Sequence, residues 1–360
     1  MCTVITRFLQ ITNVNRVNYL HRQLIINNTI NRYRQYSKMS KPSVYVTREI
    51  NREALDLLSK YCEVNLWTGP GPVPRDTLIK NVKDKNGLFC MLTDKIDAQV
   101  LDSAGPNLKV VATMSAGYDH LDLTELKKRH IKVGYTPDIL SSATAELTVA
   151  LLLATSRRLL ESSEEARNGG WQAWSPFWMC GPSLENSTVG IVGLGRIGLE
   201  VGKRLQPFGV KKFLYYNRSE KPGAKAINAV KVSFDELLRE SDFVIVTCAL
   251  TPETSNMFND EAFNKMKSTA VFINSSRGGT VDQPALIRAL ENKTIWAAGL
   301  DVMTPEPLPL DSPLFKLKNC VILPHIGSAS IDTRNQMAIL TVENILKGLN
   351  GEEMPAELKV

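Results

Sequence analysis

The stretch Thr188-Val-Gly-Ile-Val-Gly-Leu-Gly-Arg-Ile-Gly198 decides the fold of this chain. Its apolar run, Val189 to Val192, is typical of a strand that is covered on both faces. Three glycines follow at the G-x-G-x-x-G spacing: Gly193 permits a sharp turn, Gly195 lets an anion approach the backbone, and Gly198 lets a helix lie against the strand. The stretch therefore predicts a strand, a tight turn and a helix with an anion at its N-terminus.

The residues after this turn favour a dinucleotide-binding site over a purely structural glycine turn, which is the alternative. Apolar side chains at Ile197, Val201 and Leu205 recur at the spacing of an amphipathic helix, and a second apolar run, Lys212-Phe-Leu-Tyr-Tyr216, follows at the distance that a βαβ unit requires. The candidate dinucleotide-binding residues of this turn are Gly193, Gly195, Arg196, Ile197 and Gly198.

The length and composition indicate a globular chain of two domains. The chain has 360 residues, too many for one ordinary compact core, and 43% of them are hydrophobic. The longest apolar run, Val149 to Ala154, is far shorter than a membrane span, so we expect no membrane association. The cysteines and histidines are scattered singly, which predicts buried free thiols and no metal site.

The first 40 residues carry the whole excess of positive charge. The net charge is +6, and residues 1–40 contain six Arg and Lys side chains with no Asp or Glu. Because the rest of the chain is balanced, we expect no nucleic-acid surface. An Arg-rich, acid-free leader is typical of a mitochondrial transit peptide, and a disordered extension is the alternative. Translation from Met39 would instead give a cytoplasmic protein.

Apolar runs alternate with helical patterns in two blocks, which predicts an α/β fold of two Rossmann-like, doubly wound parallel-sheet domains. Strands are expected at 44–47, 88–92 and 109–112 in the first block and at 189–192, 213–216, 243–247, 270–273, 296–300 and 320–323 in the second; helices are expected at 52–60, 143–165 and 332–348. The last helix is expected to return to the first block. We therefore assign 41–140 and 326–360 to a substrate-binding domain and 141–325 to a dinucleotide-binding domain.

The segment Thr113-Met-Ser-Ala-Gly-Tyr-Asp-His120 follows the carboxyl end of an expected strand, where open α/β sheets place their ligands. Its small residues leave backbone N–H groups accessible. The amides of Ala116 and Gly117 could hold a carboxylate, with an ordinary strand-to-helix loop as the alternative.

Three further candidates follow strands of the second block. The planar guanidinium of Arg277 suits a 2-oxo carboxylate and its neighbouring oxygen. His325 could give a proton to the oxygen of a ketone that is reduced by hydride, and Glu306, in a loop flanked by prolines, would favour the charged imidazolium. Each residue alone could be an ordinary surface side chain. Together, downstream of a dinucleotide turn, they indicate a catalytic site.

Four segments resemble the D-isomer-specific 2-hydroxyacid dehydrogenase family: the glycine-rich turn, Asn274-Ser-Ser-Arg-Gly278, Gly299-Leu-Asp-Val-Met-Thr-Pro-Glu-Pro307 and Leu323-Pro-His-Ile-Gly327. The match spans residues 43–360. Within the family the chain is most similar to the animal branch that acts on glyoxylate and hydroxypyruvate, notably through Lys132-Val-Gly-Tyr-Thr-Pro-Asp138, Asn168-Gly-Gly-Trp171, Lys318-Asn-Cys-Val-Ile-Leu-Pro-His325 and Met354-Pro-Ala-Glu-Leu-Lys359.

The resemblance implies two lobes with the active site in the cleft between them, and a homodimer. It implies that Arg277 binds a small 2-oxo or 2-hydroxy acid, that His325 is the acid/base with Glu306 as its partner, and that Asp301 contacts the nicotinamide carboxamide. The expected activity is NADPH-dependent reduction of hydroxypyruvate to D-glycerate and of glyoxylate to glycolate. The alternatives are another D-2-hydroxyacid dehydrogenase, or a non-catalytic, dinucleotide-sensing protein of the same fold that resembles a corepressor.

The end of the second strand of the dinucleotide domain predicts NADPH as the coenzyme, with NADH bound more weakly. NAD enzymes carry an acidic residue there, whereas this chain reads Asn217-Arg-Ser-Glu-Lys221. Arg218, Ser219 and Lys221 can donate to a 2′-phosphate, although Glu220 is unfavourable. The remaining candidate cofactor residues are Ala249, Ser275 and Gly327.

An aromatic segment, at about 166–186 and here called the arm, precedes the glycine-rich strand. It contains Trp171, Trp174 and Trp178 and is too apolar to lie uncovered in water. We expect it to cross a homodimer interface, with Trp174 reaching the partner's cleft and limiting substrate size. The alternative is an intramolecular cover over the helix that begins at about residue 143.

Overall fold

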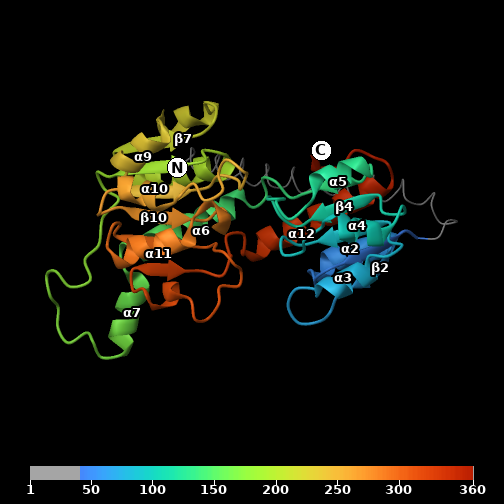
Figure 1. Cartoon of the computed structure of the whole chain (residues 1–360), viewed down its shortest axis with the longest axis horizontal. Helices are drawn as coiled ribbons and strands as arrows, with labels where there is room; N and C mark the ends of the chain where they lie inside the picture. Colours follow the sequence, from blue (N-terminus) through green and yellow to red (C-terminus); the bar gives the residue numbers. More distant parts are fainter. Residues whose placement is uncertain (1–40, 360) are drawn as a thin grey trace, which may run out of the picture.

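The computed structural model describes residues 41–359, and the expected leader at 1–40 lies outside the described residues. Two α/β lobes lie side by side, each built on its own sheet (Figure 1). The family fold expected from the sequence is therefore confirmed: two parallel-sheet α/β lobes with helices on both faces of each sheet.

The first lobe contains a six-stranded sheet in the order β13-β5-β4-β3-β1-β2. Every pair is parallel except β13 with β5, which is antiparallel. The strands are β1 (Ser43–Val46), β2 (Glu63–Leu66), β3 (Gly87–Cys90), β4 (Val110–Thr113), β5 (Lys132–Gly134) and β13 (Glu357–Leu358).

Alternate residues of these strands enter two cores, one on each face. Val44 and Val46 pack with Leu58 of α2 (Arg52–Tyr61) and Val342 of α12 (Ile331–Leu349). Tyr45 packs on the other face, which is covered by α3 (Arg75–Asn81), α4 (Ala98–Ala104) and α5 (Leu123–Lys128). The long helix α12 thus returns to the first lobe, as the sequence predicted (Figure 1).

The second lobe contains a seven-stranded, wholly parallel sheet in the order β12-β11-β10-β9-β6-β7-β8. The strands are β6 (Thr188–Val192), β7 (Lys212–Tyr216), β8 (Val230–Lys231), β9 (Phe243–Val246), β10 (Val271–Asn274), β11 (Ala297–Leu300) and β12 (Cys320–Ile322). The strand order reverses at β6, so the glycine-rich turn after this strand lies at the topological switch point of the sheet.

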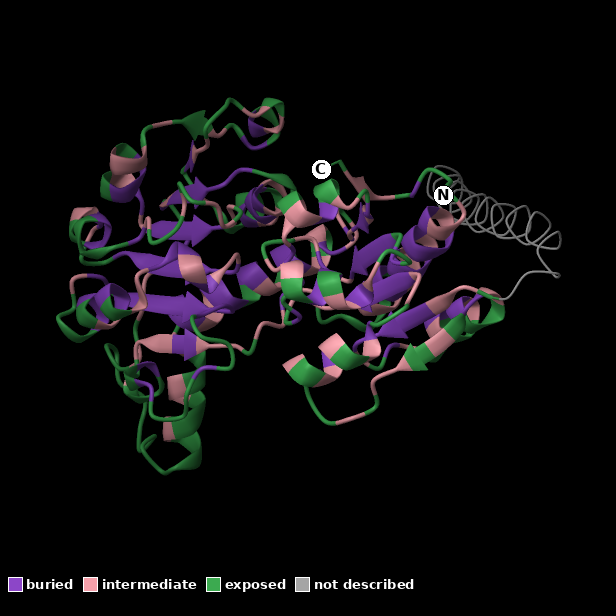
Figure 2. Cartoon of the chain, turned by 45° about the vertical axis from the view of Figure 1, so that its right-hand side comes forward, coloured by how far each residue is buried: buried purple, intermediate pink, exposed green. Residues whose placement is uncertain are grey.

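Helices cover both faces of this sheet. On one face lie α6 (Ser141–Ser156) and α8 (Arg196–Leu205); on the other lie α9 (Phe234–Glu240), α10 (Asp260–Lys265) and α11 (Gln283–Glu291). The central strands are buried on both sides (Figure 2), which explains their nearly continuous apolar sequences.

The single helix expected at 143–165 is wrong, because the chain forms two helices there. The first is α6, and α7 (Leu159–Arg167) follows in a new direction (Figure 1). Arg158 separates them with a left-handed backbone, φ 53°, and its side chain forms a fork with the Glu161 carboxylate at 2.8 and 3.0 Å. No residue of α7 is buried, so tertiary packing does not hold it in line with α6.

The arm begins at the end of α7 and extends from the second lobe as an exposed loop (Figure 2). Trp171, Trp174 and Phe177 are 63%, 83% and 88% exposed. Within a single chain the arm therefore does not cover α6 with these side chains, contrary to the intramolecular alternative.

The described cysteines differ in their burial. Cys62 and Cys90 are buried, but Cys180 is exposed on the arm, so the expectation of burial does not hold for every described cysteine. Between residues 41 and 359, no helix combines the length and apolar character needed to cross a bilayer. Over the same residues no cluster of three or more His, Cys, Asp or Glu side chains could bind a metal.

Candidate active site

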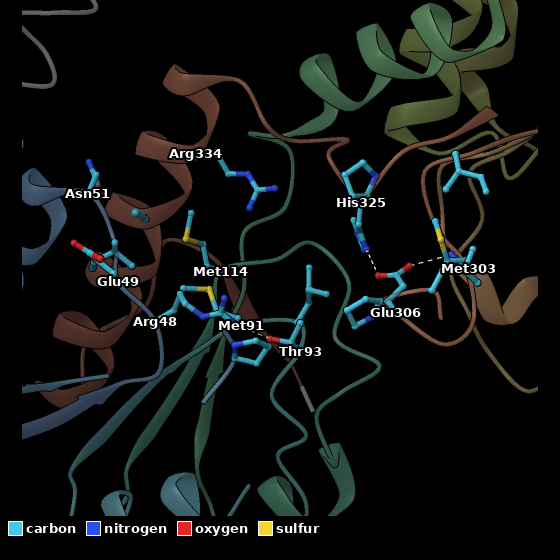
Figure 3. Close-up of a pocket in the computed structure, with 18 of the residues that line it drawn as sticks. Arg48, Glu49, Asn51, Met91, Thr93, Met114, Met303, Glu306, His325 and Arg334 are labelled. Carbon is cyan, nitrogen blue, oxygen red and sulfur yellow. Dashed lines mark hydrogen bonds and ion pairs between the residues drawn. The ribbon is translucent and has the colours of Figure 1, made fainter. Parts of the chain in front are cut away.

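Two adjoining cavities of about 1130 and 300 Å³ lie between the lobes. Both are lined by residues that follow the carboxyl ends of strands in the two sheets, and His325 and Arg334 line both. The larger cavity is seen in Figure 3, where the His325 ring and the Arg334 guanidinium project into the space between the lobes.

The structure brings His325 and Glu306 together, as the sequence predicted. Nδ1 of His325 lies 2.7 Å from one oxygen of Glu306, and the other oxygen accepts a hydrogen bond from the Met303 amide at 3.0 Å (Figure 3). Both oxygens of the carboxylate are therefore held. The contact occupies Nδ1 and leaves Nε2 of His325 as the ring nitrogen available to another group.

The electrostatic surroundings of Glu306 favour its charged form. Burial raises the pKa of Glu306, but the hydrogen bond with His325, the charge of His325 and the Met303 amide together hold it below its usual value. His325 has a left-handed backbone, φ 55°, and its own amide donates to the Asp301 carbonyl at 2.9 Å. A non-glycine residue in this conformation is held by its surroundings, which is common at functional sites.

Arg277, which follows β10, reaches across to the loop after β4 in the other lobe. Its Nε donates to the Asp119 carboxylate at 2.9 Å and its Nη1 donates to the Ser276 carbonyl at 2.9 Å. Nη2 lies directly over Gly117, where an added Cβ would collide with it. The guanidinium therefore lies beside the loop that the sequence analysis identified.

The amides of that loop are free to bind a ligand. Among residues 41–359, neither the Ala116 nor the Gly117 N–H has a hydrogen-bond acceptor, whereas the Ser115 hydroxyl donates to the Gly117 carbonyl at 2.6 Å and fixes the loop. Ala116, Gly117 and Arg277 all line the 300 Å³ cavity. Two unpaired amides and a guanidinium form a suitable site for a carboxylate.

The glycine-rich turn has the geometry that a pyrophosphate needs. Gly193 has φ 98° and packs against the backbone of Cys248, and an added Cβ at Gly198 would lie 2.7 Å from the Gly193 carbonyl. Beside Gly195, the nearest atom to an added Cβ is 4.0 Å away. The turn is therefore closed where the chain packs on itself and open at Gly195, next to the N-terminus of α8, where an anion would lie.

Most of the other predicted cofactor residues lie around the same 300 Å³ cavity as Arg277 and His325. They are Ile197, Ala249, Ser275, Asp301 and Gly327. The Asp301 carboxylate accepts hydrogen bonds from the Ile326 and Gly327 amides at 2.7 and 2.8 Å, so the Gly327 amide is already engaged within the chain. Burial raises the pKa of Asp301.

The end of β7 exposes its basic side chains. Asn217 accepts a hydrogen bond from the Leu194 amide at 2.6 Å and so ties this end of β7 to the glycine-rich turn. Arg218 and Ser219 are exposed and Lys221 is half-buried. Arg196 forms an ion pair with Asp138, which precedes α6.

Two residues of the cleft were missed by the sequence analysis. Asp119 lies in the quoted loop, but nothing in the sequence connects it with Arg277, 158 positions away in the other lobe. Arg334, in the first turn of α12, lines both cavities, and burial lowers its pKa. Trp174, in contrast, lies on the exposed arm and lines neither cavity of its own chain.

Comparison with known proteins agrees with this architecture. Residues 149–327 match the model of the D-isomer specific 2-hydroxyacid dehydrogenase, NAD binding domain. The chain is 54% identical over 320 residues to the glyoxylate reductase/hydroxypyruvate reductase of Homo sapiens, covering 88% of this chain and 98% of that protein. It is 44% identical to the glyoxylate reductase of Thermococcus kodakarensis, and the match covers 88% of this chain and 95% of that protein.

Solved structures give the same result. A crystal structure of an NADPH-dependent glyoxylate/hydroxypyruvate reductase from Sinorhizobium meliloti, in complex with NADP and malonate, matches with a TM-score of 0.78 and 32% identity, covering 89% of this chain and 97% of that one. A crystal structure of a protein from Thermus thermophilus matches with a TM-score of 0.82 and 44% identity, and the match covers 88% of this chain and 100% of that one. The chain therefore belongs to the D-isomer specific 2-hydroxyacid dehydrogenase family, whose members are oxidoreductases with a nicotinamide dinucleotide coenzyme.

Proposed function

We propose that this protein reduces hydroxypyruvate to D-glycerate and glyoxylate to glycolate with NADPH. The observation that carries the proposal is the convergence of Arg277, two unpaired loop amides and His325, which is paired with Glu306, on one interlobe cavity. The human and Sinorhizobium relatives described above are both named glyoxylate and hydroxypyruvate reductases, and the name of the Sinorhizobium protein adds that it is NADPH-dependent.

In this proposal the carboxylate of the 2-oxo acid binds the amides of Ala116 and Gly117 and the Nη edge of Arg277. The first lobe, 41–140 with 326–360, thus supplies the substrate loop, and the second lobe, 141–325, supplies Arg277 and the coenzyme site. The 300 Å³ cavity is large enough for a two- or three-carbon acid. Fixing the substrate at its carboxylate orients the neighbouring carbonyl carbon for reaction.

His325 acts as the proton donor. The reduced nicotinamide, when bound, supplies the hydride that forms the new C–H bond. As the carbonyl π bond breaks, negative charge develops on the oxygen, and Nε2 of His325 gives that oxygen its proton, which completes the 2-hydroxy acid. Glu306 accepts the Nδ1 hydrogen at 2.7 Å and favours the protonated ring before the transfer.

The coenzyme is held by the second lobe. The open space beside Gly195 and the N-terminus of α8 suit the pyrophosphate, and the exposed Arg218, Ser219 and Lys221 suit a 2′-phosphate. Asn217 is neutral where an acidic residue would repel that phosphate. The preference for NADPH over NADH rests on these side chains.

We also propose that the protein is a homodimer in which the arm crosses to the partner. The exposed aromatics Trp171, Trp174 and Phe177 need a cover that one chain does not give them. In this arrangement Trp174 closes the partner's cleft to larger acids. Sedimentation of the wild-type protein as a dimer would support the proposal, and sedimentation as a monomer would refute it.

The leader directs the protein to mitochondria, and synthesis from Met39 gives a cytoplasmic form. This proposal rests on the Arg-rich, acid-free composition of residues 1–40. Tagged full-length and Met39-start proteins should separate into mitochondrial and cytoplasmic fractions. Identical fractionation of the two forms would contradict it.

The central experiment is a substrate panel with both coenzymes. The purified protein should consume NADPH when hydroxypyruvate or glyoxylate is added, and it should consume NADPH faster than it consumes NADH. In the reverse direction it should oxidise D-glycerate but not L-glycerate. A different preferred 2-oxo acid would indicate another dehydrogenase of the family. Coenzyme binding without turnover of any 2-oxo acid would favour a dinucleotide-sensing protein.

A further inference from the structure

Asp119 joins the two lobes at the substrate loop. It follows β4 in the first lobe, and its carboxylate accepts a hydrogen bond from Nε of Arg277, in the second lobe, at 2.9 Å. The side chains are partly buried, with 37% of Asp119 and 21% of Arg277 exposed. Such a charge-assisted contact restricts the guanidinium more than a fully exposed ion pair would.

The contact determines which edge of the guanidinium remains available. Nε is engaged by Asp119, and Nη1 gives one hydrogen to the Ser276 carbonyl at 2.9 Å. Among residues 41–359, Nη2 has no hydrogen-bond acceptor and lies over Gly117, beside the unpaired amides. The free donors of Arg277 therefore face the same point as the loop amides.

The charges around Asp119 keep this arrangement in place near neutral pH. Burial raises the pKa of Asp119, but the charge and hydrogen bond of Arg277 hold it below its usual value. The neighbouring His120 is buried, which lowers its pKa to about 4, and its Nε2 contacts the Thr113 hydroxyl at 2.9 Å. His120 is thus neutral and does not compete with Arg277 for the carboxylate.

We propose that Asp119 is a positioning residue that fixes the guanidinium of Arg277 so that its Nη edge, together with the Gly117 amide, receives the 2-oxo acid carboxylate. This inference rests on the proposed function and adds a specific residue to it. Asp119 acts through Arg277 and does not itself contact the substrate.

Asp119 also has an effect in the opposite direction, because a carboxylate near the site repels an anionic substrate. Positioning of Arg277 and repulsion of the substrate predict opposite changes in the KM for the 2-oxo acid when Asp119 is removed. If repulsion dominated, removing the charge would lower the KM for the 2-oxo acid. Because both side chains are partly exposed, water screens the repulsion, whereas a misplaced guanidinium loses its hydrogen bonds to the substrate outright.

The test measures hydroxypyruvate reduction by the full chain with NADPH, and oxamate binding to the enzyme–NADPH complex, for wild type, Asp119→Asn and Asp119→Ala. Loss of one charge-assisted contact predicts a KM and an oxamate Kd raised roughly tenfold or more in Asp119→Ala, with a much smaller change in kcat. Asp119→Asn keeps an oxygen acceptor for Nε and should lie between wild type and Asp119→Ala. The Kd for NADPH should stay unchanged.

Asp138 provides a control for ion pairing between the lobes, because it too forms an ion pair with an arginine of the second lobe, Arg196, although this pair is more exposed. If Asp119 merely tied the lobes together, Asp138→Asn would raise the KM for hydroxypyruvate as Asp119→Asn does. The proposal predicts that it does not. In an Arg277→Lys background, which lacks the Nε donor, Asp119→Ala should add little further loss.

An unchanged or lowered KM in Asp119→Ala, or fully additive losses with Arg277→Lys, would overturn the inference. These outcomes leave the proposed function standing, provided that the wild-type protein reduces hydroxypyruvate. Absence of wild-type turnover would instead refute the proposed function.

Discussion

Replacing Glu306 by Gln tests the role of the carboxylate beside His325. The glutamate holds Nδ1 of His325 at 2.7 Å with one oxygen and accepts the Met303 amide at 3.0 Å with the other. Glutamine has nearly the same shape and keeps one carbonyl oxygen, so the fold should survive. What is lost is the negative charge next to the ring, together with one of the two acceptor oxygens, because the NH2 group of glutamine donates.

The magnitude follows from the kind of contact. A hydrogen bond to a charged group contributes about 1.5–3 kcal/mol and a neutral one about 0.5–1.5 kcal/mol, so the difference is about 1–1.5 kcal/mol, or roughly tenfold in kcat/KM. Both side chains are less than a third exposed, so solvent screens this difference only in part.

One part of the pH dependence should disappear in Glu306→Gln, because glutamine does not ionise. On the acid side, the lowered pKa of Glu306 keeps the carboxylate ionised below its usual range, and the pair is lost only as pH falls through that lowered value.

The assay is the pH dependence of kcat/KM for hydroxypyruvate with NADPH. Glu49→Gln is the control, because Glu49 lines the same large cavity but is exposed and points away from His325 (Figure 3). A Glu306→Gln enzyme with the wild-type kcat/KM and the wild-type pH profile, or a Glu49→Gln enzyme with the same change as Glu306→Gln, would refute the reasoning.

Three further predictions follow from the cleft, the coenzyme site and the arm. Arg218→Ala should raise the KM for NADPH about tenfold or more and that for NADH little; equal effects in steady-state kinetics would remove the argument for a 2′-phosphate contact. Gly117→Ala should displace Nη2 of Arg277 and raise the KM for hydroxypyruvate roughly tenfold while the melting temperature stays near wild type. Trp174→Ala should relax selectivity toward bulkier 2-oxo acids across a chain-length series, and removing Trp171, Trp174 and Phe177 together should give monomers on sedimentation. If the Trp174→Ala enzyme kept the wild-type preference across the chain-length series, Trp174 would have no role in substrate selectivity.

Much of the fold could be predicted because parallel strands buried on both faces have nearly continuous apolar sequences. This holds for β6, β9 and β10. The pattern fails at sheet edges: both residues of β8 are exposed, and β2 alternates with exposed Glu63 and Asn65. The antiparallel β13 has only two residues and is positioned by the chain's return after α12, which no local pattern encodes.

The break between α6 and α7 was missed for a different reason. Residues 143–165 contain no Gly or Pro that would interrupt a helix, and the left-handed backbone at Arg158 depends on a single residue's conformation. The two helices can be told apart by their packing in the structure, because α6 has many buried residues and α7 has none.

One contact of the candidate site could be predicted from the sequence and another could not. His325 and Glu306 could be paired from the sequence because both follow neighbouring strands, β12 and β11, of one sheet, whose carboxyl ends meet at one edge. The contact between Asp119 and Arg277 could not, because the two residues belong to different lobes. This contact depends on the relative orientation of the two lobes, which the sequence pattern does not specify.

The most direct test of the account is NADPH consumption with hydroxypyruvate by the wild-type and His325→Gln proteins, with the Kd for NADPH measured on both. We expect turnover by the wild-type protein, a loss of about a hundredfold to ten-thousandfold in kcat in the variant, and the same Kd for NADPH, because the proton donor acts in the transition state. A His325→Gln enzyme that reduces hydroxypyruvate at the wild-type rate would contradict the account.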